Sequence, residues 1–243
     1  TKQRDKSSKS HFRELVKMSA NVEFERLSGT YFINGALKKS KGSAAFKVSN
    51  PATGEELGFV AECTEKEIDE VFDAAKVAQK LWWAESALHR AEVLHEVARK
   101  IKDNRLELAE LLTREMGKTF KESADEVDWS VTALDYYAEI GRHEGGHVIG
   151  PAVAGQFHFT TKEPMGTVGI ILPFNFPYVL LCWEAAAAFV AGNAVVVKPS
   201  EHTSLCTLKF MEFFSDLPKG LLQCITGGAA AGQQLVSSKK TDM

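Results

Sequence analysis

The chain has 243 residues, of which 44% are hydrophobic and 25% are charged, and its formal net charge is −3. This length allows one large domain or two small ones with a substantial buried core. The near-neutral charge gives no electrostatic basis for binding nucleic acid or an anionic membrane, so we exclude both as main partners.

The N-terminal part is expected to hold a tail, two short strands and a layer of helices. Residues 1–22 are locally basic, which is more typical of a flexible tail than of a binding arm. Residues 23–146 then carry the strands, Thr30–Gly35 and Phe46–Ser49, which are bounded by glycine and by Asn50-Pro51. Four helices are predicted to follow, because apolar residues recur at helical spacing.

Local signals place the ends of these helices. Three helices open on a capping-box pattern, namely Thr64 with Glu67, Asn104 with Glu107, and Thr119 with Glu122. Gly117 is placed to end the third helix, and Gly141 lies beyond the predicted end of the fourth. The layer carries no obvious chemistry, and three of its carboxylates are expected on solvated faces: Glu115, Glu122 and Glu126.

The spacing of apolar residues changes from helical to alternating over residues 147–161. Phe157 and Phe159 alternate there with polar residues, which predicts a long hairpin or extended arm. A projecting, half-apolar arm is typical of a subunit contact. An edge hairpin of the same domain explains the pattern equally well, so both interpretations stay open at this point.

Strand-like apolar runs alternate with helix-like segments over residues 162–243. Strands are predicted at Thr167–Leu172, Ala194–Lys198 and Leu222–Thr226, and helices at Pro177–Ala191, at Ser204–Phe214 and up to Ser237. This alternation indicates an α/β fold with a Rossmann-like parallel sheet and helices on both faces. The last helix leads toward a further strand, so we expect an incomplete sheet with an open edge after its third strand.

The cysteines and the apolar segments indicate a reducing compartment. No CxxC pair or metal-binding spacing links the four cysteines, Cys63, Cys182, Cys206 and Cys224, and no secretory segment opens the chain. The longest apolar stretch, Tyr178–Ala191, is interrupted by Glu184 and is too short to span a bilayer. We therefore expect a cytoplasmic protein without a metal site, in which Cys182 and Cys206 are buried and structural.

Polar residues follow the first two strands of the predicted sheet. Asn175 follows the first strand, and Lys198, Ser200 and Glu201 follow the second. Ligands of parallel α/β sheets bind outside the carboxyl ends of the strands, so these four residues are expected to line one crevice. An asparagine between two prolines suits a fixed hydrogen-bond donor, and a carboxylate beside a lysine suits a ribose diol.

Structural roles also explain these residues when each is taken singly. Asn175 suits a local turn, and Ser200 with Glu201 suits the start of a helix. Gly227-Gly228 before the last helix could approach a phosphate, but the chain contains no GxGxxG or Walker A sequence. Spacing alone therefore leaves a nucleotide site and a structural role both open.

Longer stretches resemble the aldehyde dehydrogenase superfamily. The resemblance is carried by "GTVGIILPFNFPYVLLCWEAAAAFVAGNAVVVKPSEHTS" and "ITGGAAAGQQLVSS", and upstream by "YFINGALKK", "NPATGEELGFVAECTEKEIDEVFDAA" and "LAELLTREMGKTFKESADEV". These pieces occur in the order and spacing of the family's N-terminal half, and they cover about Tyr31 to Met243. The resemblance implies that residues 23–146 and 162–243 belong to an NAD-binding domain.

The resemblance also implies roles for individual residues. Asn175 matches the asparagine whose amide helps form the oxyanion hole, and Lys198 with Glu201 matches the pair that binds the adenosine ribose. Further matches to the cofactor cleft are Ile171, Leu172, Pro173 and Phe174, and we add Ser200 and Gly228 as cofactor-binding residues. The arm at residues 147–161 matches the family's oligomerisation hairpin, which implies a homodimer or homotetramer.

The implied reaction is the NAD(P)-dependent oxidation of an aldehyde to a carboxylic acid through a cysteine thiohemiacetal and thioester. Glu201 favours NAD over NADP, since a 2′-phosphate beside it would meet a like charge. The implied nucleophile, glutamate base and catalytic domain lie beyond this chain, so we expect the 243 residues alone to be inactive. Two alternatives remain: acyl transfer to coenzyme A or phosphate, and a non-catalytic nucleotide-binding scaffold.

Overall fold

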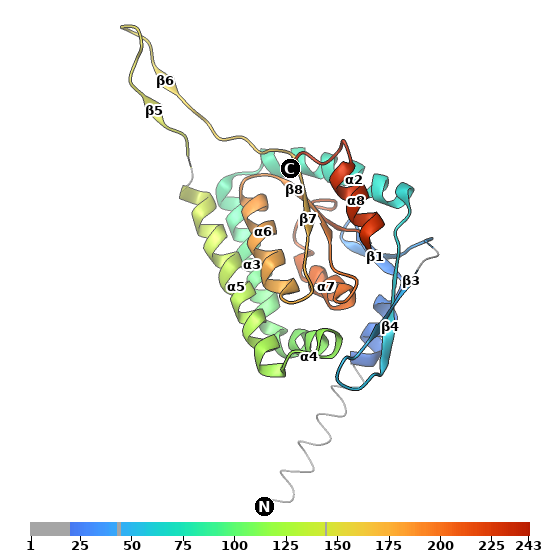
Figure 1. Cartoon of the computed structure of the whole chain (residues 1–243). Coiled ribbons are helices and arrows are strands. Elements are labelled where there is room, and N and C mark those ends of the chain that lie inside the picture. The colour runs from blue at the N-terminus through green and yellow to red at the C-terminus, as the bar shows by residue number, and fades with distance from the viewer. Residues whose placement is uncertain (1–19, 43–44, 144) are drawn as a thin grey trace, which may run out of the picture.

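Five strands form the central sheet of the computed structural model, which describes residues 20–42, 45–143 and 145–243 (Figure 1). The strand order is β2-β1-β9-β8-β7. Their bounds are β1 Thr30–Ile33, β2 Ala36–Lys39, β7 Thr167–Ile171, β8 Ala194–Lys198 and β9 Leu222–Cys224. All five residues of β8 are buried, as expected for an apolar strand covered on both faces.

The predicted parallel arrangement is confirmed for β7, β8 and β9, whereas β1 runs antiparallel to both β2 and β9. The sheet is therefore mixed. The prediction of an open sheet edge after the third strand is wrong, because β1 pairs with β9 at that edge. At the opposite edge, the backbone of β7 bonds to the C-terminal residues: the Asp242 amide donates to Thr167 at 2.9 Å, and the Gly169 amide donates to Met243 at 2.8 Å.

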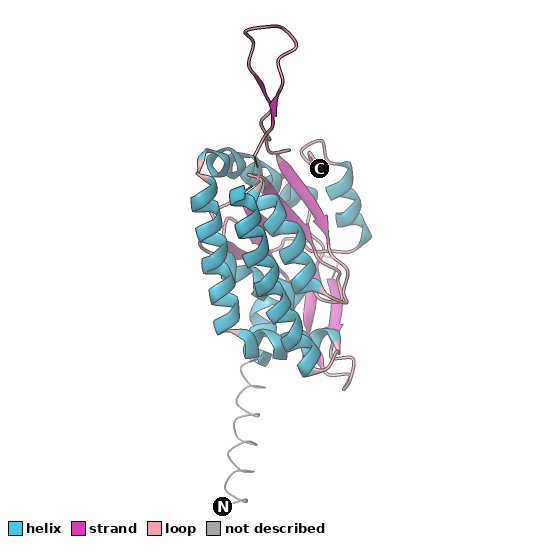
Figure 2. Ribbon diagram, turned by 90° about the vertical axis from the view of Figure 1, so that its left-hand side faces the viewer, coloured by secondary structure: helices cyan, strands magenta, loops and turns pink. Residues whose placement is uncertain are grey.

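Helices cover both faces of this sheet, as Figure 2 shows. On one face lie α2 (Glu65–Ala84) and α8 (Ala229–Ser237). On the other lie α6 (Pro177–Val190) and α7 (Ser204–Met211), the latter continued by a 3₁₀ turn at Glu212–Phe214. Each of α6, α7 and α8 follows a parallel strand, so the carboxyl ends of β7, β8 and β9 lead to the N-termini of three helices.

The remaining helices form a layer against α6, in which α3, α5 and α6 lie side by side (Figure 1). Their bounds are α3 Ala87–Asp103, α4 Arg105–Met116 and α5 Phe120–His143, and residues 20–27 are also helical. Of the predicted basic tail, residues 1–19 lie outside the described residues. Among the described residues, every helix is too short or too polar to cross a membrane.

The predicted helix ends are confirmed in part. The Thr64–Glu67 and Thr119–Glu122 capping boxes form, and Gly117 ends α4 in a left-handed conformation at φ 93°. The predicted start of the third helix is confirmed, because α4 begins at Arg105 directly after Asn104. The Asn104 side chain does not cap it, however, since its amide donates back to the Lys100 carbonyl.

The predicted stop at Gly141 is also wrong, since α5 continues to His143. A Cβ at position 141 would lie 2.5 Å from Val190 Cβ, so this glycine allows α5 to approach α6 closely.

Two hairpins complete the described chain. Strands β3 (Ala45–Ser49) and β4 (Glu56–Ala61) pair with each other, and only the first of them was predicted. Strands β5 (Val148–Ile149) and β6 (His158–Phe159) form the long hairpin predicted for residues 147–161. In Figure 1 this hairpin projects from the body as an arm.

Candidate active site

The loop after β7 presents backbone and side chains at the carboxyl end of the sheet. Ile171, Pro173, Phe174 and Asn175 are exposed, while the side chain of Leu172 is buried in the core. The Leu172 amide donates to the Lys198 carbonyl at 3.0 Å, which ties this loop to the end of β8. Only the backbone of Leu172 is therefore available to a ligand at this surface.

The end of β8 is built around a buried ammonium group. Lys198 Nζ donates to the carbonyls of Pro199 and Gly227, each at 2.9 Å, and so joins β8 to the loop after β9. Glu201 Oε2 lies 4.0 Å from this Nζ. Burial lowers the pKa of Lys198, and the negative charge of Glu201 opposes that effect.

Ser200 and Glu201 do not start a helix. Helix α7 begins later, at Ser204, and the Ser200 hydroxyl instead accepts from the His202 amide at 3.3 Å within a turn. The Glu201 side chain is 34% exposed and accepts no hydrogen bond from the described residues. The alternative in which Ser200 and Glu201 start a helix is therefore wrong, and the Glu201 carboxylate remains available.

The structure brings the ends of β7 and β8 together with α8. A Cβ at Gly232 would lie 3.5 Å from the side-chain stem of Lys198 and 3.9 Å from Ile171. The rings of Phe174 and His202 meet almost at right angles, with centroids 6.0 Å apart. We call the side chains gathered here the strand-end surface: Ile171, Pro173, Phe174, Lys198, Ser200 and Glu201.

Asn175 occupies a different part of this end of the sheet. Its carbonyl accepts a hydrogen bond of 2.6 Å from Lys118, which precedes α5, and its side-chain amide makes no hydrogen bond to the described residues. The structure thus links Asn175 to the helical layer rather than to Lys198 or Glu201. Its free amide remains able to donate to a ligand.

Protein carboxylates already occupy the N-termini of all three helices that follow the parallel strands. Glu126 accepts from the Tyr178 amide of α6 at 2.8 Å, and Glu115 accepts from the Leu205 amide of α7 at 2.9 Å. Glu62 accepts from the Gly228 amide at 2.9 Å, at the start of α8. The backbone amides that could bind a phosphate at these helix N-termini are therefore already hydrogen-bonded to protein carboxyl groups.

This arrangement corrects two expectations. Glu115 and Glu126 are 4% and 0% exposed, so they do not lie on solvated faces. Burial raises the pKa of Glu115 to about 7 and also raises that of Glu126, although backbone amides oppose the effect in both cases. The Gly227-Gly228 sequence is also not free to hold a phosphate, because the Glu62 carboxylate takes the Gly228 amide.

The four cysteines are all buried, as predicted for Cys182 and Cys206. Burial raises the pKa of every one of them, to about 11 in the case of Cys63. Each therefore remains a protonated thiol at neutral pH, so the site lacks a thiolate nucleophile among the described residues.

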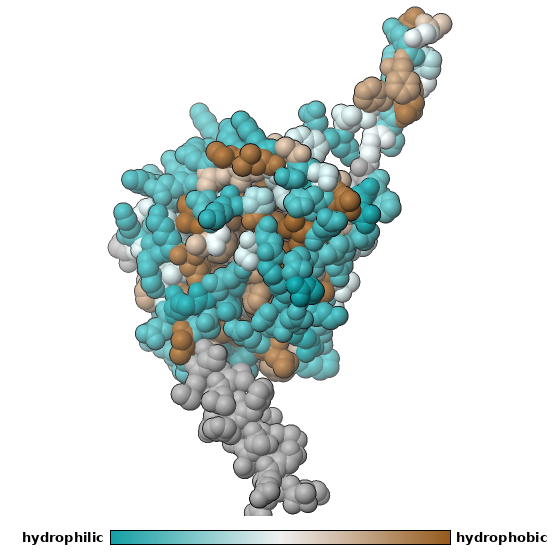
Figure 3. All heavy atoms as spheres, turned by 180° about the vertical axis from the view of Figure 1, so that it is seen from behind, coloured by the Kyte–Doolittle hydropathy of each residue, from teal (hydrophilic) through white to brown (hydrophobic). Residues whose placement is uncertain are grey.

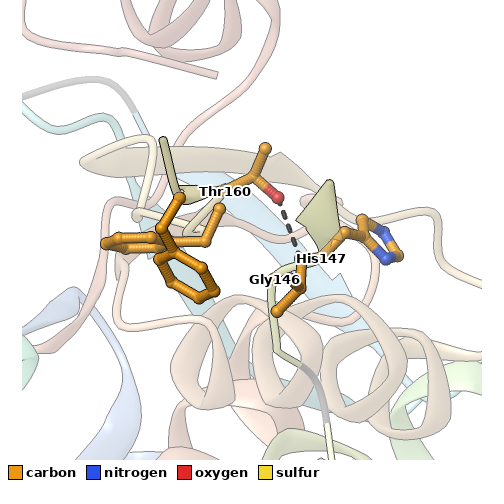
Figure 4. Close-up of a pocket in the computed structure, with 6 residues that line it drawn as sticks. Gly146, His147 and Thr160 are labelled. Carbon is orange, nitrogen blue, oxygen red and sulfur yellow. Dashed lines mark hydrogen bonds between the residues drawn. The ribbon is translucent and has the colours of Figure 1, made fainter. Parts of the chain in front are cut away.

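The arm carries an apolar surface of its own. Val148, Ile149, Phe157 and Phe159 are exposed, and Figure 3 shows apolar side chains on the arm beyond the body of the molecule. A hollow of about 350 Å³ is lined by Gly146, His147, Val148, Phe157, Phe159 and Thr160. The His147 amide donates to the Thr160 hydroxyl at 3.0 Å and holds the two sides of the hairpin together (Figure 4).

Comparison with known proteins shows which family this sequence matches. The sequence profile of the "Aldehyde dehydrogenase family" matches residues 37–243. The alpha-ketoglutaric semialdehyde dehydrogenase of Bacillus subtilis is 36% identical over 208 residues, which cover 84% of this chain and 43% of that protein. The 4-trimethylaminobutyraldehyde dehydrogenase of Rattus norvegicus is 36% identical over 219 residues, covering 86% and 44%.

Solved structures agree with this assignment of the fold. The NAD+ complex of the aldehyde dehydrogenase from Bacillus cereus superimposes with a TM-score of 0.84 at 32% identity, covering 88% of this chain and 45% of that one. The aldehyde dehydrogenase of Brucella melitensis gives 0.83 at 29% identity, with the same coverage. The chain thus spans less than half the length of these relatives.

Proposed function

Because the chain belongs to the aldehyde dehydrogenase family, we propose that it forms the cofactor-binding part of an enzyme that oxidises an aldehyde to a carboxylic acid. One observation carries the proposal. The Asn175 amide and the Glu201 carboxylate follow adjacent parallel strands, and neither makes a hydrogen bond to the described residues. A free donor and a free acceptor at neighbouring strand ends are what a carbonyl substrate and a ribose require.

The strand-end surface fits the ribose of a nicotinamide dinucleotide. Glu201 would accept from the ribose hydroxyls, and Lys198, whose Nζ lies 4.0 Å from Glu201 Oε2, would add a donor beside it. Ile171, Pro173 and Phe174 would line the adjoining part of the cofactor site. NAD, when bound, supplies the acceptor for the hydride that leaves the substrate. Since carboxylates cap α6, α7 and α8, the pyrophosphate needs donors other than the N-termini of these helices.

We further propose that the cofactor is NAD rather than NADP. The Glu201 charge would repel a 2′-phosphate, whereas a 2′-hydroxyl would donate to it. The relatives include a "NADP-dependent glyceraldehyde-3-phosphate dehydrogenase" from Arabidopsis thaliana, 36% identical over 206 residues, so the preference needs a direct test.

Asn175 is proposed to donate to the substrate carbonyl oxygen as negative charge develops on it. The nucleophile would be a cysteine outside these 243 residues, which passes through a thiohemiacetal and a thioester, with a glutamate base that releases the acid. The raised pKa of all four cysteines here supports that placement.

Glu201→Gln in the full-length protein is expected to weaken NAD binding about tenfold or more, because glutamine keeps an acceptor oxygen but loses the charge that strengthens the hydrogen bonds from the ribose hydroxyls. Binding of NADP should weaken less or improve, since the repulsion is removed. Titration calorimetry with each dinucleotide measures both constants. Glu92→Gln, at an exposed position of α3, is the matched control and should change neither. An unchanged dissociation constant for NAD in Glu201→Gln would exclude the ribose role.

The arm is proposed to join subunits into a homodimer or homotetramer. Phe157 is 72% exposed at its apolar surface, so Phe157→Asp should shift the protein to a smaller species in light scattering after size exclusion. Val77→Asp, at a similarly exposed apolar position on α2, serves as the control. An identical mass for Phe157→Asp and the parent protein would argue against this interface.

A further inference from the structure

Two buried charges lie against the segment that carries Asn175. Lys118 precedes α5 and its side chain is 8% exposed, while that of Glu126, within α5, is 0% exposed. Lys118 Nζ forms an ion pair with Glu126 Oε2 and donates to the Asn175 carbonyl at 2.6 Å. The same ammonium lies 4.1 Å from the centre of the Phe176 ring, within the range of a cation–π contact.

The second oxygen of Glu126 holds the other side of the same segment. Oε1 accepts from the Tyr178 amide at 2.8 Å and from the Val179 amide at 3.3 Å, in the first turn of α6. Between these contacts, Pro177 restricts the backbone at the first helical position. The ion pair therefore holds the chain on both sides of Phe176, at Asn175 and in the first turn of α6.

Stability alone is a weak explanation for this arrangement. Burying two charges costs desolvation free energy, and an apolar pair of similar volume is often as stable. Capping of a helix requires only the carboxylate, because Glu115 caps α7 without an ion pair to any residue that the structure describes. The lysine adds a hydrogen bond to one carbonyl, that of Asn175, and this contact fixes the peptide from which the free amide projects.

We propose that Lys118, held by Glu126, is a positioning residue for Asn175. The inference rests on the proposed function, in which the Asn175 amide donates to the developing oxyanion. Such a donor acts only if it is fixed in place before the reaction, and a displacement of about 1 Å can cost about a hundredfold in rate. Neither Lys118 nor Glu126 needs to touch the substrate in this role.

Lys118→Met tests the inference in the full-length protein, because methionine keeps most of the side-chain stem and removes the ammonium. We expect kcat to fall about tenfold or more, while the dissociation constant of NAD stays the same. Lys118→Arg should restore most of the loss. Lys121→Met is the matched control, since Lys121 is 84% exposed on α5 and pairs with Asp125. Should Lys118→Met not fold, Glu126→Gln replaces it, because glutamine keeps an oxygen to cap α6 and removes the counter-charge.

A double-mutant cycle with Asn175→Ala separates positioning from a general structural role. If Lys118 acts through Asn175, Lys118→Met should lower kcat little in the Asn175→Ala background. Equal losses in both backgrounds would overturn the inference. Full activity of Lys118→Met, together with a large loss in Asn175→Ala, would also overturn it and leave the proposed function standing. Full activity of Asn175→Ala itself would instead remove the oxyanion role on which the inference rests.

Discussion

Replacing Asn175 with alanine in the full-length protein is expected to lower kcat about a hundredfold or more. The amide is a free donor beside α6, and removal of one oxyanion donor typically costs about 3 to 4 kcal/mol of transition-state stabilisation. NAD affinity should hardly change, because Asn175 contacts the helical layer and not Lys198 or Glu201. Aldehyde-dependent formation of reduced NAD measures the first effect, and titration calorimetry measures the second.

Asn175→Asp is the sharper companion variant. Aspartate keeps the shape of the side chain but loses the donor and adds a negative charge where an oxyanion would form, so turnover should be at least as low as in Asn175→Ala. Full turnover in either variant would refute the role of Asn175. The comparison also bears on the alternatives, since acyl transfer to coenzyme A or phosphate needs the same donor and a non-catalytic scaffold needs none.

Most of the fold could be predicted because its core strands are apolar runs flanked by helical periodicity. Strand β8 was predicted at Ala194–Lys198 and lies there, since five buried residues in succession leave little ambiguity. Strand β2, Ala36–Lys39, was missed because it is mostly exposed and reads as polar. Its extended conformation depends on pairing with β1, which the local sequence does not specify.

The site could be predicted less completely, for a related reason. Asn175, Lys198 and Glu201 stand at the ends of recognisable strands, so the topology of a parallel sheet places them near its carboxyl edge. Lys118 and Glu62 carry no such signal, because their partners, Asn175 and Gly228, are 57 and 166 residues away in the chain. Contacts of this length become visible only when the elements are packed.

For the buried carboxylates a signal did exist. Glu115 follows Leu108, Leu111 and Leu112 at helical spacing, so it stands on the apolar face of α4. A carboxylate on that face must either face solvent at the edge of the stripe or find hydrogen-bond donors in the interior. The donors are the amides of Leu205 and Cys206, which the sequence of α4 could not reveal.

The same geometry explains why the helix N-termini are unsuitable for phosphates. Every helix that follows a parallel strand is capped by a glutamate from a distant segment, so the layer of helices and the sheet depend on each other for hydrogen bonds. In the proposed site, ligand contacts would therefore come from the exposed groups between the strands and the caps. Asn175 lies between β7 and Tyr178, and Glu201 lies between β8 and Leu205.

Glu115→Ala is expected to destabilise the full-length protein by about 2 to 5 kcal/mol, because two buried amides at the start of α7 lose their acceptor. The urea midpoint of unfolding measures the loss. Glu110→Ala, at a partly exposed position of the same helix, should change it by less than about 1 kcal/mol. Similar midpoints for the two variants would show that the hydrogen bonds from α7 to Glu115 add no net stability.

Glu115 should also make stability depend on pH. Its pKa is raised by burial from 4.5 to about 7 in the folded protein, so between these values the folded state holds a proton that the unfolded chain has released. The contribution of this proton to the free energy of unfolding is complete below the pKa of the unfolded chain. It is lost as the pH rises through about 7, and the free energy of unfolding then falls by on the order of 3 kcal/mol. Glu115→Gln removes this titration, and its urea midpoint should therefore change less than that of the parent protein between about pH 5 and about pH 8. Parallel curves for the two proteins would mean that Glu115 ionises at its ordinary pKa, and that its two amide hydrogen bonds fully offset the cost of burying the charge.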